Sequence, residues 1–304
     1  MFCLARWHKR LLRPLDACGI DGPIPLADCQ YCCRGRLLEW GSLTSSNQGL
    51  MQVAHILRGA RESFTTVASP SSLYPDLTID DAYEIQQQLI DEWVASGAKI
   101  KGFKVGLTSR AMQEQLGVDQ PDFGQLLDDM FQNQDTPIRA SAYLQPKIEP
   151  EIAFVMGSEL KGPGVCAAEA EAAVDHVVAS LEIIDSRVTD WRITIVDTIA
   201  DNASSAGVVT GQTPLKLSDI DLASIKCRLL VDAQPVASGV GQAVMGDPIN
   251  ALVWLANTLG ARGIGFRPGD VVMPGSLTAA QPVRAGSVVR AEFDGLGPVT
   301  ATFV

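Results

Sequence analysis

Two glutamates, Glu149 and Glu151, lie two positions apart in the segment QPKIEPEIAF at residues 145–154. An apolar run follows at 152–156, so the segment reads as a β-strand. Successive side chains of a strand point to opposite faces, so both carboxylates face the same way. A third acid, Glu182, lies about thirty residues later among apolar neighbours. Adjacent carboxylates repel each other unless a cation or a shared proton compensates. Three of them on apolar elements suggest an oxygen-bound divalent cation, Mg²⁺ or Mn²⁺. The alternative is that the three acids face solvent on an edge strand.

Other residues that could take part in catalysis or binding lie singly along the sequence. Lys104 lies in a mostly apolar stretch between two glycines, where it is either a desolvated acid/base group or a lysine on an exposed edge strand. Asp122 is flanked by turn-forming residues, so it is a turn aspartate or a loop carboxylate used for acid/base work. Gly275 and Ser276 follow a short strand and could offer amides and a hydroxyl to a carboxylate. The polar run at 201–205 interrupts apolar flanks, so we expect its side chains to form a hydrogen-bonded network.

Composition excludes several functional classes. The 304 residues are 46% hydrophobic and carry a net charge of −11, which argues against a nucleic-acid partner. No apolar run approaches the roughly 20 residues that a bilayer-spanning helix needs. We therefore expect a soluble, cytoplasmic protein. Three histidines in the whole chain make a Ser-His-Asp triad or a histidine zinc site improbable.

The first fifty residues differ from the remainder. They hold five of the seven cysteines, more basic than acidic residues and no sustained periodicity. Cys29, Cys32 and Cys33 have the spacing of half a zinc site, but no second pair follows. We interpret residues 1–50 as a disordered or mis-annotated extension, with translation starting at Met51.

From Met51 onward the pattern is regular. Helices are predicted at 51–63, at 79–96 with Thr78 as N-cap, at 112–116, at 167–180 and at 248–260 with Asp247 as N-cap. Strands are predicted at 100–108, 182–184, 271–273, 288–293 and 299–303, with strand-like pieces in 190–211. Helices come first and strands dominate later, without strict βαβ alternation. This order indicates an α+β fold.

Several stretches, in this order, resemble one family. They are GFKVGLTS (102–109), LGVDQPDFG (116–124), the acidic strand at 145–154, LEIIDSR (181–187), DTIADNASS (197–205), WLAN (254–257) and GSL (275–277). Together they resemble the 2-keto-4-pentenoate hydratase / 4-oxalocrotonate decarboxylase family of the fumarylacetoacetase-like superfamily.

The resemblance implies a fold and a division of the chain. The fold is a mixed β-roll or sandwich core of the fumarylacetoacetase C-terminal type. A helical part at 51–100 would precede the catalytic domain at 101–304. A homo-oligomer is also implied.

Residue roles follow from the same resemblance. Metal ligands fall on Glu149, Glu151 and Glu182, binding Mg²⁺ or Mn²⁺. Acid/base work falls on Lys104 and Asp122, without assignment of which is acid and which is base. Leu107 and Ser276 fall near the bound carboxylate of the substrate.

Two activities occur in this family. Hydratases, which are hydro-lyases, add water to 2-hydroxypenta-2,4-dienoate and give 4-hydroxy-2-oxopentanoate, in meta-cleavage catabolism of aromatic compounds. Decarboxylases release CO₂ from 2-oxohex-3-enedioate, one step earlier. The motifs QPDFG, Asp190-Trp191 and GSL favour a hydratase, whereas Ser204-Ser205 is closer to the decarboxylases. A non-catalytic partner of a pathway decarboxylase or aldolase is a third possibility, against which the complete set of acidic residues argues.

Overall fold

The structure is a computed structural model, and it describes residues 47–304. Its first elements are helices α1 (Asn47–Ser63), α2 (Pro70–Leu73) and α3 (Ile79–Ala95). Thr78 caps α3 as predicted: its hydroxyl accepts from the Asp81 N–H, and the Asp81 carboxylate accepts from the Thr78 N–H. Helix α1 begins four residues before the predicted position and buries Leu50. Residues 47–50 of the segment interpreted as an extension therefore belong to α1, and its other residues, 1–46 with Cys29, Cys32 and Cys33, lie outside the described part.

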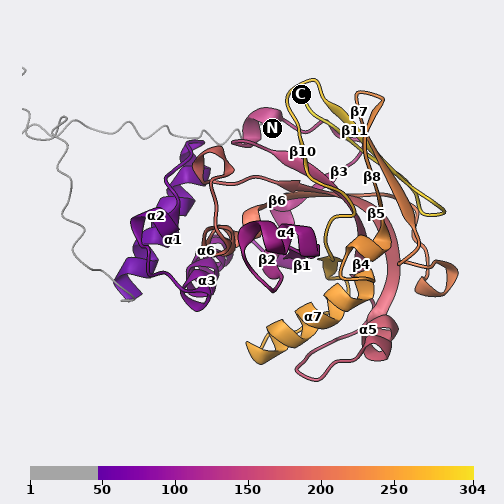
Figure 1. Ribbon diagram of the computed structural model, residues 1–304, viewed down its shortest axis with the longest axis horizontal. Coiled ribbons are helices and arrows are strands. Elements are labelled where there is room, and N and C mark those ends of the chain that lie inside the picture. Colours follow the sequence, from indigo (N-terminus) through magenta and orange to yellow (C-terminus); the bar gives the residue numbers. More distant parts are fainter. Residues whose placement is uncertain (1–46) are drawn as a thin grey trace, which may run out of the picture. The chain divides into compact units, whose positions relative to one another are not determined.

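The helices at the start pack on one another and on a later helix. Ile85 and Leu89 of α3 and Ile199 of α6 (Ile195–Ala200) share an apolar cluster with residues of α1. Full burial of such a side chain contributes about 1.5–3 kcal/mol. Figure 1 shows α1, α2, α3 and α6 grouped together. A second cluster, in which Ile90 of α3 is buried with Leu126 and Met273, joins the helical part to the strands.

The larger sheet has a mixed topology. Its spatial order is β2 (Asp122–Leu127), β1 (Ile100–Gly106), β9 (Val271–Met273), β4 (Lys147–Met156), β5 (Val174–Ile184), β6 (Ser205–Thr210) and β3 (Phe131–Asn133), and β10 (Gln281–Pro282) also pairs with β4. The β1–β9 and β3–β6 pairs are parallel, and the other neighbours are antiparallel. Strands from distant parts of the sequence therefore meet around β4.

A smaller antiparallel sheet covers part of the larger one. It contains β12 (Gly297–Thr302), β11 (Val288–Phe293), β7 (Lys226–Val231) and β8 (Gln234–Val240), in that spatial order. Val289, Ala291 and Val299 of this sheet are buried in the same cluster as Ile152, Phe154 and Leu181 of the larger sheet. The α+β fold with a mixed, curled sheet core, expected from the resemblance, is confirmed.

The remaining helices cover the sheet and lead into its strands. They are α4 (Arg110–Leu116), α5 (Ala167–Ala173) and α7 (Pro248–Ala261). Helix α7 has the predicted N-cap, since the Asp247 carboxylate accepts from the Ile249 N–H at 2.9 Å. No helix in the described residues is both long and apolar enough to cross a membrane.

Two sequence-based assignments are wrong. The helix predicted at 167–180 ends at Ala173, and β5 begins at the next residue. Val174, Val177 and Val178 are β-branched residues that pair with β4, and this pairing outweighs the helix propensity of the alanines. The strand-like piece near Ile195 is instead α6, whose N-cap Thr194 donates its N–H and its hydroxyl to the Asp197 carboxylate.

Candidate active site

The three glutamates converge on two neighbouring strands. Glu149 lies directly opposite Glu182 in the β4–β5 pairing, and Glu151 follows two residues later on the same face. Each residue offers one carboxylate oxygen, and these three oxygens lie within 4.8 Å of one another. Strand β4 is flanked by β9 and β5, and Glu151 and Glu182 are each only 1% exposed. The alternative of solvent-facing acids on an edge strand is therefore wrong.

Burial makes this cluster unfavourable in its fully charged form. Burial raises the pKa of Glu182 to about 7 and, with the charges of Glu182 and Glu149 adding to it, raises the pKa of Glu151 well above its usual range. Glu151 Oε1 and both Glu182 oxygens have no hydrogen-bond partner within residues 47–304. The remaining Glu151 oxygen accepts from the Gly275 N–H at 2.8 Å. Unsatisfied buried carboxylate oxygens at this spacing fit a hard divalent cation.

Lys104 lies beside the cluster in its charged form. Its Nζ is 3.5 Å from Glu182 Oε2 and donates to the Ala203 carbonyl at 3.1 Å. Burial alone would lower the pKa of Lys104, but the carboxylates of Glu182 and Asp122 outweigh it and raise the pKa. Strand β1 lies between β2 and β9, so Lys104 is not on an exposed edge.

Asp122 begins strand β2, where it pairs with Gly106 of β1. The prediction of a turn or loop aspartate is wrong, because β1 extends the pairing back to this position. The side chain is 1% exposed, and its Oδ1 has no hydrogen-bond partner among the described residues. Burial raises the pKa of Asp122, and Lys104 opposes this shift. A methyl group built on Gly106 would lie 2.1 Å from Asp122 Oδ1 and 3.4 Å from Lys104 Nζ, so both groups surround this glycine.

A cavity of about 730 Å³ opens above these residues. The predicted residues on its wall are Lys104, Leu107, Asp122, Glu149, Glu151 and Ser276. Glu182 is not on the wall but pairs with Glu149 from the neighbouring strand. Gly275 and Ser276 were expected to offer an amide and a hydroxyl to a carboxylate, and this expectation is confirmed only in part. The Gly275 amide already donates to Glu151, and the Ser276 hydroxyl donates to the Thr278 carbonyl at 2.7 Å.

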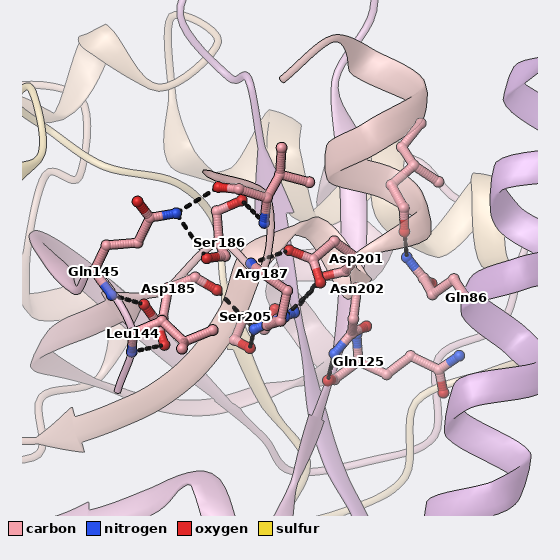
Figure 2. A network of polar contacts seen from close by, with 12 residues as sticks. Gln86, Gln125, Leu144, Gln145, Asp185, Ser186, Arg187, Asp201, Asn202 and Ser205 are labelled. Atoms are coloured by element: carbon pink, nitrogen blue, oxygen red, sulfur yellow. Dashed lines mark hydrogen bonds and ion pairs between the residues drawn. The ribbon is translucent and has the colours of Figure 1, made fainter. Parts of the chain in front are cut away.

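The polar run at 201–205 forms the predicted network. Asp201 pairs with the buried Arg187, and Figure 2 shows that Arg187 also reaches the carbonyl of Asp185. The Asn202 side chain bonds both backbone groups of Gln125, accepting from its N–H at 2.8 Å and donating to its carbonyl at 2.9 Å. These contacts hold a short turn whose carbonyl, that of Ala203, accepts from Lys104.

Three consecutive residues of this turn, Asn202, Ala203 and Ser204, have φ angles of 53°, 51° and 54°. Left-handed backbone at residues other than glycine costs free energy and concentrates at functional sites. The network on either side therefore holds a strained turn against the cavity.

Ser204 and Lys147 are among the polar residues on the cavity wall that were not predicted as site residues. The Ser204 hydroxyl is buried without a hydrogen-bond partner within the described chain. It had been noticed only as part of the polar run. Lys147 also lines the cavity. Its signal was present in the sequence, because the spacing that aligns Glu149 with Glu151 also aligns Lys147 with both.

The comparisons with known proteins agree with this geometry. The family model described as fumarylacetoacetate (FAA) hydrolase C-terminal matches residues 101–304. A 2-keto-4-pentenoate hydratase of Paraburkholderia xenovorans (strain LB400) is 40% identical over 252 residues, covering 83% of this chain and 94% of that protein. A 2-oxo-hept-4-ene-1,7-dioate hydratase of Escherichia coli is 34% identical over 258 residues, covering 83% of this chain and 97% of that protein.

A solved structure is also similar. The 4-oxalocrotonate decarboxylase of Pseudomonas putida G7, complexed with magnesium and adipate, superposes with a TM-score of 0.83 at 33% identity. The superposition covers 86% of this chain and 99% of the decarboxylase.

Proposed function

The chain belongs to the fumarylacetoacetate hydrolase family, and we propose that it is a hydratase that adds water to 2-hydroxypenta-2,4-dienoate, giving 4-hydroxy-2-oxopentanoate. The observation that carries the proposal is the cluster of Glu149, Glu151 and Glu182 beside Lys104 and Asp122 on one cavity. The 40% identity to named hydratases supports this reaction over the other reactions of the family. The enzyme would serve the meta-cleavage catabolism of aromatic compounds.

We assign the metal ligands to Glu149, Glu151 and Glu182, and the metal to Mg²⁺ with Mn²⁺ as the alternative. Within residues 47–304, the buried oxygens of Glu151 and Glu182 that lack a hydrogen-bond partner support this assignment, as does the magnesium in the decarboxylase structure. A bound cation of this kind supplies a Lewis acid for the C1 carboxylate and C2 oxygen of a 2-oxo acid. Asp122 and Lys104 are left to handle protons and position the substrate.

Proton transfer is assigned to the two groups around Gly106. The reaction moves protons in two stages: C5 gains a proton as the C2 hydroxyl loses one, which gives the 2-oxo-3-enoate. Water then adds at C4 and loses a proton, while C3 gains one. Asp122 Oδ1 is a buried acceptor without a hydrogen-bond partner in the part of the chain that the structure describes, so we assign it the proton of the water. Lys104 is a donor in its ammonium form and is held towards the cavity by the Ala203 carbonyl, so we assign it the delivery of a proton. Leu107 and Ser276 line the cavity and are assigned to the substrate's carboxylate end.

The test is turnover of 2-hydroxypenta-2,4-dienoate by the purified full-length chain. We expect loss of the dienol absorbance and formation of 4-hydroxy-2-oxopentanoate. Chelator should abolish this activity and Mg²⁺ should restore it. Absence of water addition with either Mg²⁺ or Mn²⁺ would refute the proposal.

A second candidate is decarboxylation of 2-oxohex-3-enedioate. The superposition on the decarboxylase and the Ser204-Ser205 pair favour it. The two reactions are separated by supplying each substrate and measuring CO₂. Release of CO₂ from the dicarboxylate without hydration of the dienoate would replace the first proposal.

Assembly and location follow from the proposed pathway. We propose a cytoplasmic homo-oligomer, which in turn contacts the decarboxylase or aldolase of the pathway. Light scattering of the purified chain tests the oligomer, and co-purification with either enzyme tests the contact.

A further inference from the structure

Lys147 is a cation that is affected by the nearby charge of Glu149 but forms no ion pair with it. It lies on β4 two residues before Glu149, on the same face, and its side chain lines the cavity. Among residues 47–304 it takes part in no ion pair. By contrast, Lys104 pairs with Glu182, Arg187 with Asp201, and Lys216 with Asp175. Its contact is the ring of Trp191, with Nζ 4.1 Å from the ring centroid.

Trp191 is held in place for this contact. Asp190 and Trp191 have φ angles of 57° and 56°, a conformation that is costly for residues with a side chain. The Trp191 Nε1–H donates to the Gln145 carbonyl at 3.0 Å, two residues before Lys147. The ring therefore fixes the ammonium against the wall by a cation–π contact. Such a contact uses one side of the ammonium and leaves donors for a ligand.

The cavity has room beyond a five-carbon acid. Its volume of about 730 Å³ falls in the range of pockets that bind drug-sized ligands, roughly 300–1,000 Å³. Lys147 and Trp191 also line a second hollow, of about 490 Å³, on which Arg284 lies. The Lys147–Trp191 pair thus lies where the two hollows adjoin. A substrate chain that extends from the glutamate cluster would meet the Lys147 ammonium there.

We propose that Lys147 is the subsite for a second carboxylate at the far end of the substrate, so that the enzyme accepts 2-hydroxydienoates that are dicarboxylates. This inference rests on the proposed function and extends its substrate class. Strand geometry places the Lys147 and Glu149 Cα atoms roughly 7 Å apart, so one ligand can reach both. The wall carries two other cations: Lys104 pairs with Glu182, and the Arg192 side chain is 83% exposed and lies 3.7 Å from Asp190. The E. coli relative is named for a seven-carbon dicarboxylate.

The test compares a monocarboxylate with a dicarboxylate in the full-length chain. Lys147→Met keeps the aliphatic stem and removes the charge. We expect it to raise KM for a seven-carbon 2-hydroxydienedioate about 10- to 100-fold, the usual effect of losing a charged hydrogen bond. KM for 2-hydroxypenta-2,4-dienoate and both kcat values should stay within about twofold. Lys147→Arg should recover part of the loss, and Lys226→Met, at an exposed position on β7, is the matched control.

Each other outcome has a distinct meaning. Equal loss for both substrates in Lys147→Met would overturn the proposal and assign Lys147 to the charge balance of the glutamates. Hydration of the monocarboxylate but not of the dicarboxylate by the wild type would also overturn it, and would leave the proposed function intact. If the wild type hydrates neither substrate, the proposed function itself fails. In that case, the subsite is tested on the decarboxylation reaction. A saturated dicarboxylate should inhibit CO₂ release by the wild type and should inhibit it less in Lys147→Met.

Discussion

Gly106 governs how closely the two proton-transfer candidates approach each other. Asp122 Oδ1 and Lys104 Nζ both lie around its Cα, where no side chain separates them. We expect Gly106→Ala to displace the Asp122 carboxylate, because the added methyl would lie 2.1 Å from its oxygen. A misplacement of about 1 Å is enough to lower kcat roughly 10²-fold. Steady-state kinetics on the dienoate measure this effect.

Gly59→Ala is the matched control for that substitution. Gly59 lies within α1, and a methyl group there would meet nothing within 4 Å. We expect unchanged kinetics and a slight gain in stability, up to about 1 kcal/mol, because alanine favours a helix. Equal kinetics in the two glycine variants would show that the spacing around Gly106 is unimportant.

The assigned roles of Asp122 and Lys104 predict a loss in kcat for each. Asp122→Asn keeps the size of the side chain and removes the proton acceptor, and Lys104→Ala removes the donor. We expect each to lower kcat by roughly 10²- to 10⁴-fold, the usual contribution of an acid/base group. Melting temperature and Mg²⁺ affinity serve as controls for folding and metal binding. Full turnover in either variant would eliminate its assigned role.

At the scale of elements, the turn η4 (Asn202–Ser204) connects a buried network to the reacting groups. Asn202→Ala removes two hydrogen bonds to the Gln125 backbone and places alanine in a left-handed conformation. We expect the free energy of unfolding to fall by about 2–3 kcal/mol. We also expect kcat to fall while KM stays nearly constant, because the Ala203 carbonyl no longer holds Lys104. Denaturant unfolding and kinetics measure the two effects.

Two further variants separate positioning from simple destabilisation. Asn202→Asp keeps the acceptor for the Gln125 N–H and should recover part of kcat. Asn250→Ala, at an exposed position whose Nδ2 donates to the Met245 carbonyl at 3.0 Å, should leave kcat unchanged. If Asn202→Ala loses stability but keeps kcat, the turn has no role in placing Lys104.

Local signals determine which elements the sequence can predict. The α3 and α7 helices are predicted well because their caps, Thr78 and Asp247, act within a few residues. Strand β5 is mispredicted because its conformation depends on pairing with β4, whose paired residues lie 18 or more positions earlier. Asp122 is misplaced for the same reason, since β1 rather than its own neighbours makes it part of a strand.

The residues of the site also divide into those that a local sequence pattern marks and those that only the fold brings together. The glutamates were predicted as a set because their spacing on a strand and the order of the motifs both mark them. Lys147 has the same two-residue spacing, but its contact with Trp191 joins β4 to a segment more than forty residues later, and no local pattern in the sequence shows it. The Ser204 hydroxyl, which has no hydrogen-bond partner among residues 47–304, depends on a backbone conformation that no local residue pattern requires.

At the scale of the whole molecule, the glutamate cluster couples metal, protons and stability. The pKa of Glu182 is raised to about 7, and the pKa values of Glu149 and Glu151 are also raised, chiefly by burial. At a pH above the ordinary pKa of glutamate, these carboxyl groups lose their protons in the unfolded chain but keep them in the metal-free folded protein. The stability of the metal-free protein should therefore be greatest at low pH in this range and should fall as pH rises from about 4.5 to 7.

Metal should reverse this dependence, because a cation binds the deprotonated carboxylates and stabilises the fold by mass action. We expect the Tm difference between Mg²⁺-loaded and chelator-treated protein to be small near pH 5 and to grow to several degrees by pH 8. Each pKa unit corresponds to about 1.4 kcal/mol, and a domain of this size shifts by roughly 2–4 °C per kcal/mol. Burial raises the pKa of Asp201 to about 6, and Arg187 opposes this shift. Asp201 contributes equally to the stability of the metal-loaded and metal-free protein, so its effect cancels in the Tm difference. Glu182→Gln should weaken the pH dependence of the metal-free protein. A Tm difference that is independent of pH would contradict metal binding at these glutamates.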